Sequence, residues 1–172
     1  MSDYTKAANL GLANIWVAFG AFAVAALLGL YQVIERTDLV PALQSPDVYF
    51  GSVSTHGVLM GFVLTTFFIV GFGYYTASTS LKQEIWNKPL AWFGFYLCLT
   101  GVVLAAVPLL TGNASVLYTF YPPLQAHPAF YIGAALLVVG SWVWCLEMVV
   151  MWVIWKKAHP GETVPLAMFG TT

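Results

Sequence analysis

The sequence has 172 residues, of which 60% are hydrophobic and only 8% are charged, and its formal net charge is −1. A soluble domain carries about 25% charged residues, so this composition excludes an ordinary soluble domain and indicates a chain that lies mostly in a membrane. The near-neutral charge offers no basic surface for a nucleic acid, and no partner of that class is expected. Cys98 and Cys145 fall inside apolar runs and are interpreted as packing residues rather than as a disulfide or a metal pair.

Four apolar segments are each long enough to cross about 30 Å of hydrocarbon as a helix. They comprise residues 14–34, 48–75, 89–110 and 127–155. A strand exposed to lipid requires a closed barrel and an alternating pattern, which these runs do not show. The sequence therefore predicts an all-α, polytopic membrane protein with four transmembrane helices, forming a single transmembrane domain over residues 1–172.

The basic residues predict the orientation of this domain. If the helices alternate in direction, five lysines fall on one side of the membrane: Lys6, Lys82, Lys88, Lys156 and Lys157. Only Arg36 falls on the other side, beside acidic residues that include Asp38. Because cytoplasmic loops carry the excess of Lys and Arg, both termini are expected in the cytoplasm of a prokaryotic cell, and residues 35–47 and 111–126 are expected outside.

Two segments outside the helices have unusual composition. Residues 111–126 contain no charge and three aromatic residues, so this loop is expected to fold down onto a buried surface rather than extend into water. The tail, residues 158–172, is polar at first and becomes apolar at residues 164–169. That pattern is expected of a segment that approaches a further helix or docks against another chain.

His56 is the main candidate for a functional residue within the predicted helices. Ionisable residues inside a membrane are costly and often functional, and a neutral imidazole is a good iron ligand. The alternative is a polar side chain that hydrogen-bonds to another helix. Gly57 and Gly61 leave room for either a flat cofactor or a neighbouring helix, and spacing alone does not decide. The neighbours at helical spacing are Ser52, Val53, Leu59, Met60 and Val63.

His127 and Glu147 are further candidates. His127 precedes the fourth helix and could cap it or could meet a cofactor's carboxylates on the outer side. Glu147 lies in the last part of the same helix. It could take up protons, although an interfacial side chain that reaches toward water is the simpler interpretation.

These residues lie in segments that resemble one family. Residues 54–62, Ser-Thr-His-Gly-Val-Leu-Met-Gly-Phe, resemble the helix-two segment of haem-copper oxidase subunit I, which carries one axial histidine of the low-spin haem. Residues 116–127 resemble the loop before helix four, with its Tyr-Pro-Pro-Leu core, and residues 29–32, Gly-Leu-Tyr-Gln, are similar to the B-type pattern. The A-type has an Asp in the loop that corresponds to residues 76–88, and none occurs here. The resemblance covers residues 14–168 and is closest to the B-type.

The resemblance implies specific roles for a few residues. His56 would be an axial ligand of a low-spin haem of the b type, and Tyr118, Tyr121 and His127 would cover that haem from the outer side. The family's second low-spin ligand, high-spin haem ligand and copper histidines have no matching positions here. A partner chain would then carry the remaining subunit I helices with copper and the high-spin haem. A second subunit would bind copper or the electron donor.

Three functions follow from these interpretations. In the first, the chain is one part of a split subunit I in a respiratory terminal oxidase that reduces oxygen to water, and it is not catalytic alone. In the second, it is a free-standing membrane carrier of electrons that binds haem b in its own four-helix bundle, with His127 as the second ligand. In the third, it is a structural accessory subunit without haem.

Overall fold

Four long helices dominate the computed structural model, which describes residues 5–37, 40–41 and 45–171, with backbone only for residues 5–8. They are α1 (Thr5–Arg36), a continuous helix from Pro46 to Leu81, α4 (Lys88–Leu110) and α5 (Pro128–Ala158). All four are long and apolar enough to cross a membrane. A short α6 (Leu166–Phe169) follows. The predicted all-α fold with four transmembrane helices is therefore confirmed, with most helices longer at one or both ends than predicted.

The second transmembrane helix contains an irregularity near its middle. It consists of α2 (Pro46–Val58), a π-helical segment η2 (Leu59–Leu64) and α3 (Thr65–Leu81). A π segment inside an α-helix adds a residue to the turn and frequently marks a functional site. Here it begins three residues after His56.

Local sequence signals explain where several helices begin. Asn87 precedes α4, and its side-chain oxygen accepts a hydrogen bond from the backbone N–H of Leu90 at 3.1 Å. Proline occupies the first turn of α2, α4 and α5, where its missing N–H is not needed. A local signal also explains where α3 ends. Lys82, the residue after its last turn, adopts a left-handed conformation with φ of 51°, which stops the helix.

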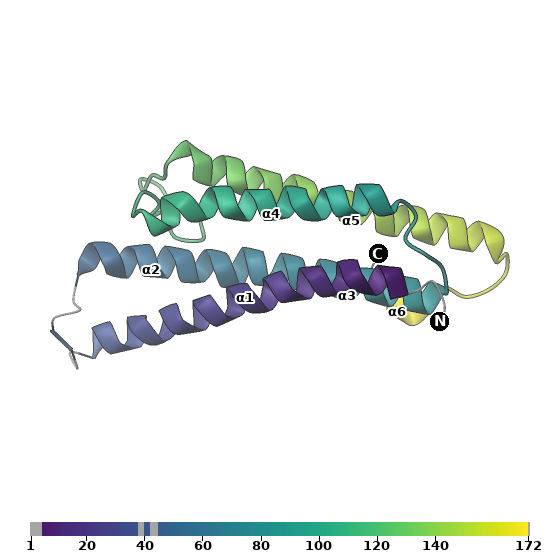
Figure 1. The fold of residues 1–172 in the computed structure, drawn as a ribbon, viewed down its shortest axis with the longest axis horizontal. Helices are drawn as coiled ribbons and strands as arrows, with labels where there is room; N and C mark the ends of the chain where they lie inside the picture. Colours follow the sequence, from purple (N-terminus) through teal and green to yellow (C-terminus); the bar gives the residue numbers. More distant parts are fainter. Residues whose placement is uncertain (1–4, 38–39, 42–44, 172) are drawn as a thin grey trace.

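The helices form two layers (Figure 1). α4 packs beside α5 in one layer, and α1 packs beside α2, η2 and α3 in the other. Gly101 and Gly133 face each other across the α4–α5 contact, where a Cβ atom on either residue would collide with the backbone of the other. Small residues of this kind allow helices to pack closely in a membrane, where van der Waals contact is the main stabilising term.

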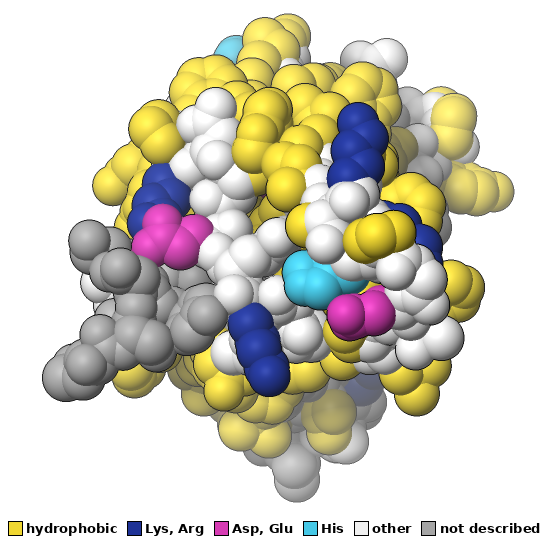
Figure 2. Space-filling model, turned by 90° about the vertical axis from the view of Figure 1, so that its right-hand side faces the viewer, with side chains coloured by type: hydrophobic (Ala, Val, Ile, Leu, Met, Phe, Trp, Pro, Cys, Tyr) yellow, Lys and Arg dark blue, Asp and Glu magenta, His cyan; other side chains and the backbone are white. Residues whose placement is uncertain are grey.

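The basic residues separate between the two ends of the bundle. α3 ends, α4 begins and α5 ends at the same end of the molecule (Figure 1). Figure 2 views this end, which we call the lysine end, and shows basic side chains in dark blue around it, with acidic side chains in magenta among them. The lysines of these helix termini are Lys82, Lys88, Lys156 and Lys157. Arg36 ends α1 at the opposite end. The side chain of Lys6 and residue Asp38 lie outside the described part of the chain.

The tail folds back onto the bundle. After α5 the chain turns, and α6 packs against α3. Met168 is fully buried there, whereas Leu166 and Phe169 are 85% and 71% exposed. The expected apolar segment at residues 164–169 therefore contributes one side chain to the core and directs two outward.

Candidate functional site

The imidazole of His56 is held against α1. Its Nδ1 atom lies 2.8 Å from the backbone carbonyl oxygen of Ala25. A carbonyl oxygen can only accept a hydrogen bond, so Nδ1 must carry the proton and donate it. In a neutral imidazole the lone pair then resides on Nε2. Metal-binding histidines are commonly oriented in this way, with one ring nitrogen donating to a carbonyl and the other left for the metal.

A glycine on α1 provides the space for this ring. A Cβ atom on Gly29 would lie 3.2 Å from Cε1 and 3.5 Å from Nδ1 of His56. The first distance is tighter than ordinary van der Waals contact, so a larger side chain would displace the ring. Ala25 and Gly29 are one turn apart on α1, and together they fix both the direction and the position of the imidazole.

The loop between α4 and α5 folds onto α2, as the sequence predicts. The backbone N–H of Leu117 donates to Oγ of Ser54, which is fully buried, at 2.9 Å. Ala114 and Val116 are buried as well. The Phe120 ring lies 6.0 Å, centroid to centroid, from the ring of Phe62 on η2. This loop is thus part of the packed structure next to His56, although it has no regular secondary structure of any length.

Tyr118 occupies the space above the glycines that follow His56. A Cβ atom on Gly57 would lie 2.8 Å from the Cβ of Tyr118, and one on Gly61 would lie 3.9 Å from its Cδ2. The sequence left open whether a cofactor or a helix used this space, and the structure shows a loop tyrosine there. Tyr118 is still 51% exposed and Tyr121 is 60% exposed, so both predicted tyrosines lie at the surface of the described chain.

His127 caps α5. Its Nδ1 accepts a hydrogen bond from the backbone N–H of Ala129 at 3.2 Å, and its side chain is exposed. Because Nδ1 uses its lone pair in this bond, a neutral His127 carries its proton on Nε2. The exposed nitrogen is therefore a hydrogen-bond donor. The capping role that the sequence raised as one alternative is confirmed.

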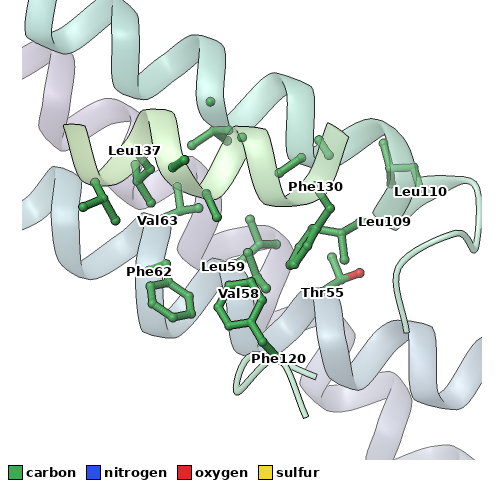
Figure 3. Close-up of a pocket in the computed structure, with 18 of the residues that line it drawn as sticks. Thr55, Val58, Leu59, Phe62, Val63, Leu109, Leu110, Phe120, Phe130 and Leu137 are labelled. Carbon is green, nitrogen blue, oxygen red and sulfur yellow. The ribbon is translucent and has the colours of Figure 1, made fainter. Parts of the chain in front are cut away.

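A separate apolar cavity of about 630 Å³ lies between the two helix layers (Figure 3). Residues of α2, η2, α4 and α5 line it, together with Val24 of α1 and Phe120 of the loop. Among these described lining residues, only Thr55 and Trp142 carry side-chain polar atoms. Leu59 and Val63, which share a helical face with His56 in the sequence, line this cavity, whereas the His56 ring is directed toward α1. His56 itself is not among the described residues that line the cavity.

Comparison with known proteins identifies the family. The family model described as "Cytochrome C and Quinol oxidase polypeptide I" matches residues 9–172. The chain belongs to this family. It is 36% identical over 159 residues to cytochrome c oxidase subunit 1 of Thermus thermophilus, an alignment that covers 89% of this chain and 28% of the relative.

A solved structure shows the same arrangement of helices. The chain matches a protein in a cryo-EM structure of a heme-copper terminal oxidase dimer with a TM-score of 0.90 and 35% sequence identity. The match covers 99% of this chain and 29% of that one. The 172 residues therefore correspond to somewhat more than a quarter of each of these relatives, and they form a multi-pass membrane portion of the subunit I fold.

Sequence reasoning singled out His56 as a candidate but missed the residues that orient its ring. Ala25 acts through its backbone carbonyl, which has no signature in the sequence. Gly29 was noticed only as part of a resemblance, and Ser54 only as part of the motif before His56. Their roles depend on α1 and the α4–α5 loop lying against α2, so only the assembled helices reveal them.

Proposed function

We propose that this chain supplies part of the low-spin haem site of a respiratory terminal oxidase that reduces oxygen to water, with His56 as an axial ligand through Nε2. The observation that supports this proposal is the 2.8 Å contact between His56 Nδ1 and the Ala25 carbonyl. It fixes the tautomer that leaves Nε2 available, and it holds the ring in one orientation.

The haem is a group that accepts and passes on single electrons when it is bound. The residues of this chain hold and orient it. His56 binds the iron, and the ring is kept in place by Ala25 and Gly29. Tyr118, Tyr121 and His127 all lie in or next to the α4–α5 loop and expose polar groups. The Nε2–H of His127 and the two phenol groups can donate hydrogen bonds to haem carboxylates, so we assign this loop to the outer edge of a b-type haem.

The rest of the site belongs to other parts of the complex. We propose that the remaining subunit I helices contribute the second axial ligand, the high-spin haem and copper, and that a second subunit binds copper or the electron donor. Lipid covers the outward apolar side chains. The lysine end faces the cytoplasm, because Lys and Arg concentrate on that side of membrane proteins. Both termini then lie in the cytoplasm of a prokaryotic cell.

The geometry of His127 argues against a free-standing haem carrier. That function needs a second imidazole nitrogen with a lone pair for the iron. In His127 the lone pair of Nδ1 is engaged by the Ala129 N–H, and Nε2 is protonated. Ligation by His127 would require loss of the α5 cap, which stabilises a helix by about 1 kcal/mol.

The test is to replace the histidines one at a time in the assembled complex. His56→Ala should remove the low-spin haem signal from the reduced-minus-oxidised visible spectrum, whereas His127→Ala should retain it. His159→Ala is the matched control, because His159 stacks on Trp155 in the tail, with ring centroids 4.5 Å apart. An intact low-spin signal in His56→Ala would refute the proposal. Loss of the signal in both His56→Ala and His127→Ala would favour the free-standing carrier.

A further inference from the structure

A second polar site lies between α3 and α5, away from His56. Several buried polar atoms there have no hydrogen-bond partner: Oγ of Ser78, Nε1 of Trp144 and Oε1 of Glu147. The indole of Trp144 lies against Gly73 of α3, which places Trp144 at the contact of the two helices. Ser78 is five residues further along α3, and Glu147 is three residues further along α5. Unpaired polar atoms are costly to bury, so a concentration of them at one helix contact calls for an explanation.

Glu147 is the ionisable member of this group. Its side chain is completely buried. Oε2 accepts a hydrogen bond from the backbone N–H of Asn87 at 3.3 Å, and Oε1 has no partner. Lys88, the basic residue that follows Asn87, pairs instead with Glu84. The carboxyl group therefore has no cation beside it among the described residues.

The surrounding groups push the carboxyl toward opposite protonation states. Full burial without a cation favours the neutral acid, because an ionised carboxylate is far more expensive to bury. The N-terminus of α4, where Asn87 provides its N–H, favours the anion through the helix dipole. The other titratable groups in this part of the bundle are Tyr74 on α3, Cys98 on α4 and Cys145 on α5, of which Tyr74 and Cys98 are buried. None of these carries a positive charge.

The loop between α3 and α4 contacts α5 close to Glu147. Residues 82–87 connect α3 to α4 at the lysine end, and this loop passes over α5. The side-chain amide of Gln83 donates to the carbonyl oxygen of Met151 at 3.0 Å. Met151 is one helical turn beyond Glu147, and Asn87, which donates to Glu147, ends the same loop, so this loop lies against the buried carboxyl.

We infer that Glu147 is a proton-binding site beneath the loop of residues 82–87, and that it exchanges its proton with the medium at the lysine end. Binding converts the carboxylate into the neutral acid and needs no other reactant. Three polar groups are available to form hydrogen bonds as the protonation state of Glu147 changes. They are the unpaired Oε1 of Glu147, the Ser78 hydroxyl, which can donate or accept, and the Trp144 indole N–H, which can donate. This inference does not depend on haem binding by His56.

Infrared difference spectroscopy of the intact complex in membranes tests the inference. The wild type should show the carbonyl stretch of a protonated carboxyl group, and the band should shift in D₂O as the proton exchanges. Glu147→Gln should abolish this band. Glu162→Gln is the matched control, because Glu162 is exposed in the tail, and it should leave the band unchanged. A band that survives in Glu147→Gln, or that fails to shift in D₂O, would overturn the inference.

Two further variants cover other outcomes. If Glu147→Gln does not fold, Glu147→Asp keeps a carboxyl group and should shift the band without removing it; an unshifted band would assign it to another residue. Gln83→Ala removes the bond to Met151 and should speed hydrogen exchange of the carboxyl group. Unchanged exchange would rule out the loop as the route. None of these measurements requires haem, so failure here and failure of the His56 proposal are distinguishable.

Discussion

Tyr118 lies directly on Gly57, the residue that follows the candidate haem ligand. A Cβ atom at position 57 would lie only 2.8 Å from both Cβ and Cδ1 of Tyr118. The close contact involves the Tyr118 Cβ, which cannot move without its backbone, so the α4–α5 loop itself would have to shift. The loop and α2 are therefore matched in shape at the position where His56 is presented.

Gly57→Ala should destabilise the protein for this reason. Overpacking a well-packed site costs about 1–3 kcal/mol, and here the loop must move outward. Chemical denaturation of the membrane protein, followed by circular dichroism, measures the change. Gly51→Ala is the control on the same helix, because a Cβ atom there would meet nothing within 4 Å. Equal stability of the two variants would contradict the packing seen between Gly57 and Tyr118.

Ser54→Ala should loosen the α4–α5 loop. The substitution removes the acceptor of the Leu117 N–H and leaves that donor without a partner, which costs about 1–2 kcal/mol. Leu117 has a left-handed φ of 59°, a conformation unfavourable for a non-glycine residue, and the lost bond helps to hold it. Hydrogen exchange of the loop amides should rise. Thr79→Ala, which removes only hydrogen bonds within α3, should leave the loop protected.

Gly29→Ala should perturb the His56 ring without removing it. The new methyl group would lie 3.2 Å from Cε1, so the ring must shift and its bond to Ala25 must lengthen or bend. If His56 binds iron, the low-spin haem spectrum and midpoint potential should change while the haem content remains. Gly20→Ala, on the same helix with open space around it, should leave both unchanged. Identical spectra for the two variants would argue against iron ligation by His56.

The orientation can be tested with single cysteines. In a background that lacks Cys98 and Cys145, Asn113→Cys in the α4–α5 loop should react with a membrane-impermeant reagent added to intact cells. Glu162→Cys in the tail should react only after the membrane is opened, because the lysine end is predicted to face the cytoplasm. The reverse pattern of labelling would invert the topology.

The 172 residues expressed without the rest of the complex should contain little haem. His56 would supply one axial ligand, and a haem pocket with a missing partner leaves a polar site unsatisfied in apolar surroundings. The helices also lose the packing against neighbours that stabilises them in lipid. The experiment is to purify the isolated chain in the presence of added haem and to measure the amount of haem that it retains. Stoichiometric six-coordinate haem on the isolated chain would contradict the split-site proposal and support the free-standing carrier.

The fold class and the transmembrane segments could be predicted from the sequence, because they depend on properties of single segments. Each helix must bury about 20 consecutive apolar residues in lipid. The helix starts are also signalled locally, by the side-chain cap of Asn87 and by the first-turn prolines Pro89 and Pro128. The separation of the lysines from Arg36 was also predictable, because it depends only on which end of each apolar segment a basic residue follows or precedes. The uncharged composition of the α4–α5 loop also correctly indicated that it packs onto the bundle.

The tertiary structure alone decided how the site is built. The sequence marks His56 as unusual, but its tautomer follows from a carbonyl of α1 that lies 31 residues earlier, and a carbonyl is present at every residue. In the same way, the sequence leaves two interpretations for Glu147, whereas its burial beneath the 82–87 loop appears only once α3, α4 and α5 are packed. A hydrogen bond or a buried charge depends on which backbone lies opposite a side chain, and that is set by helix packing rather than by any local pattern of residues.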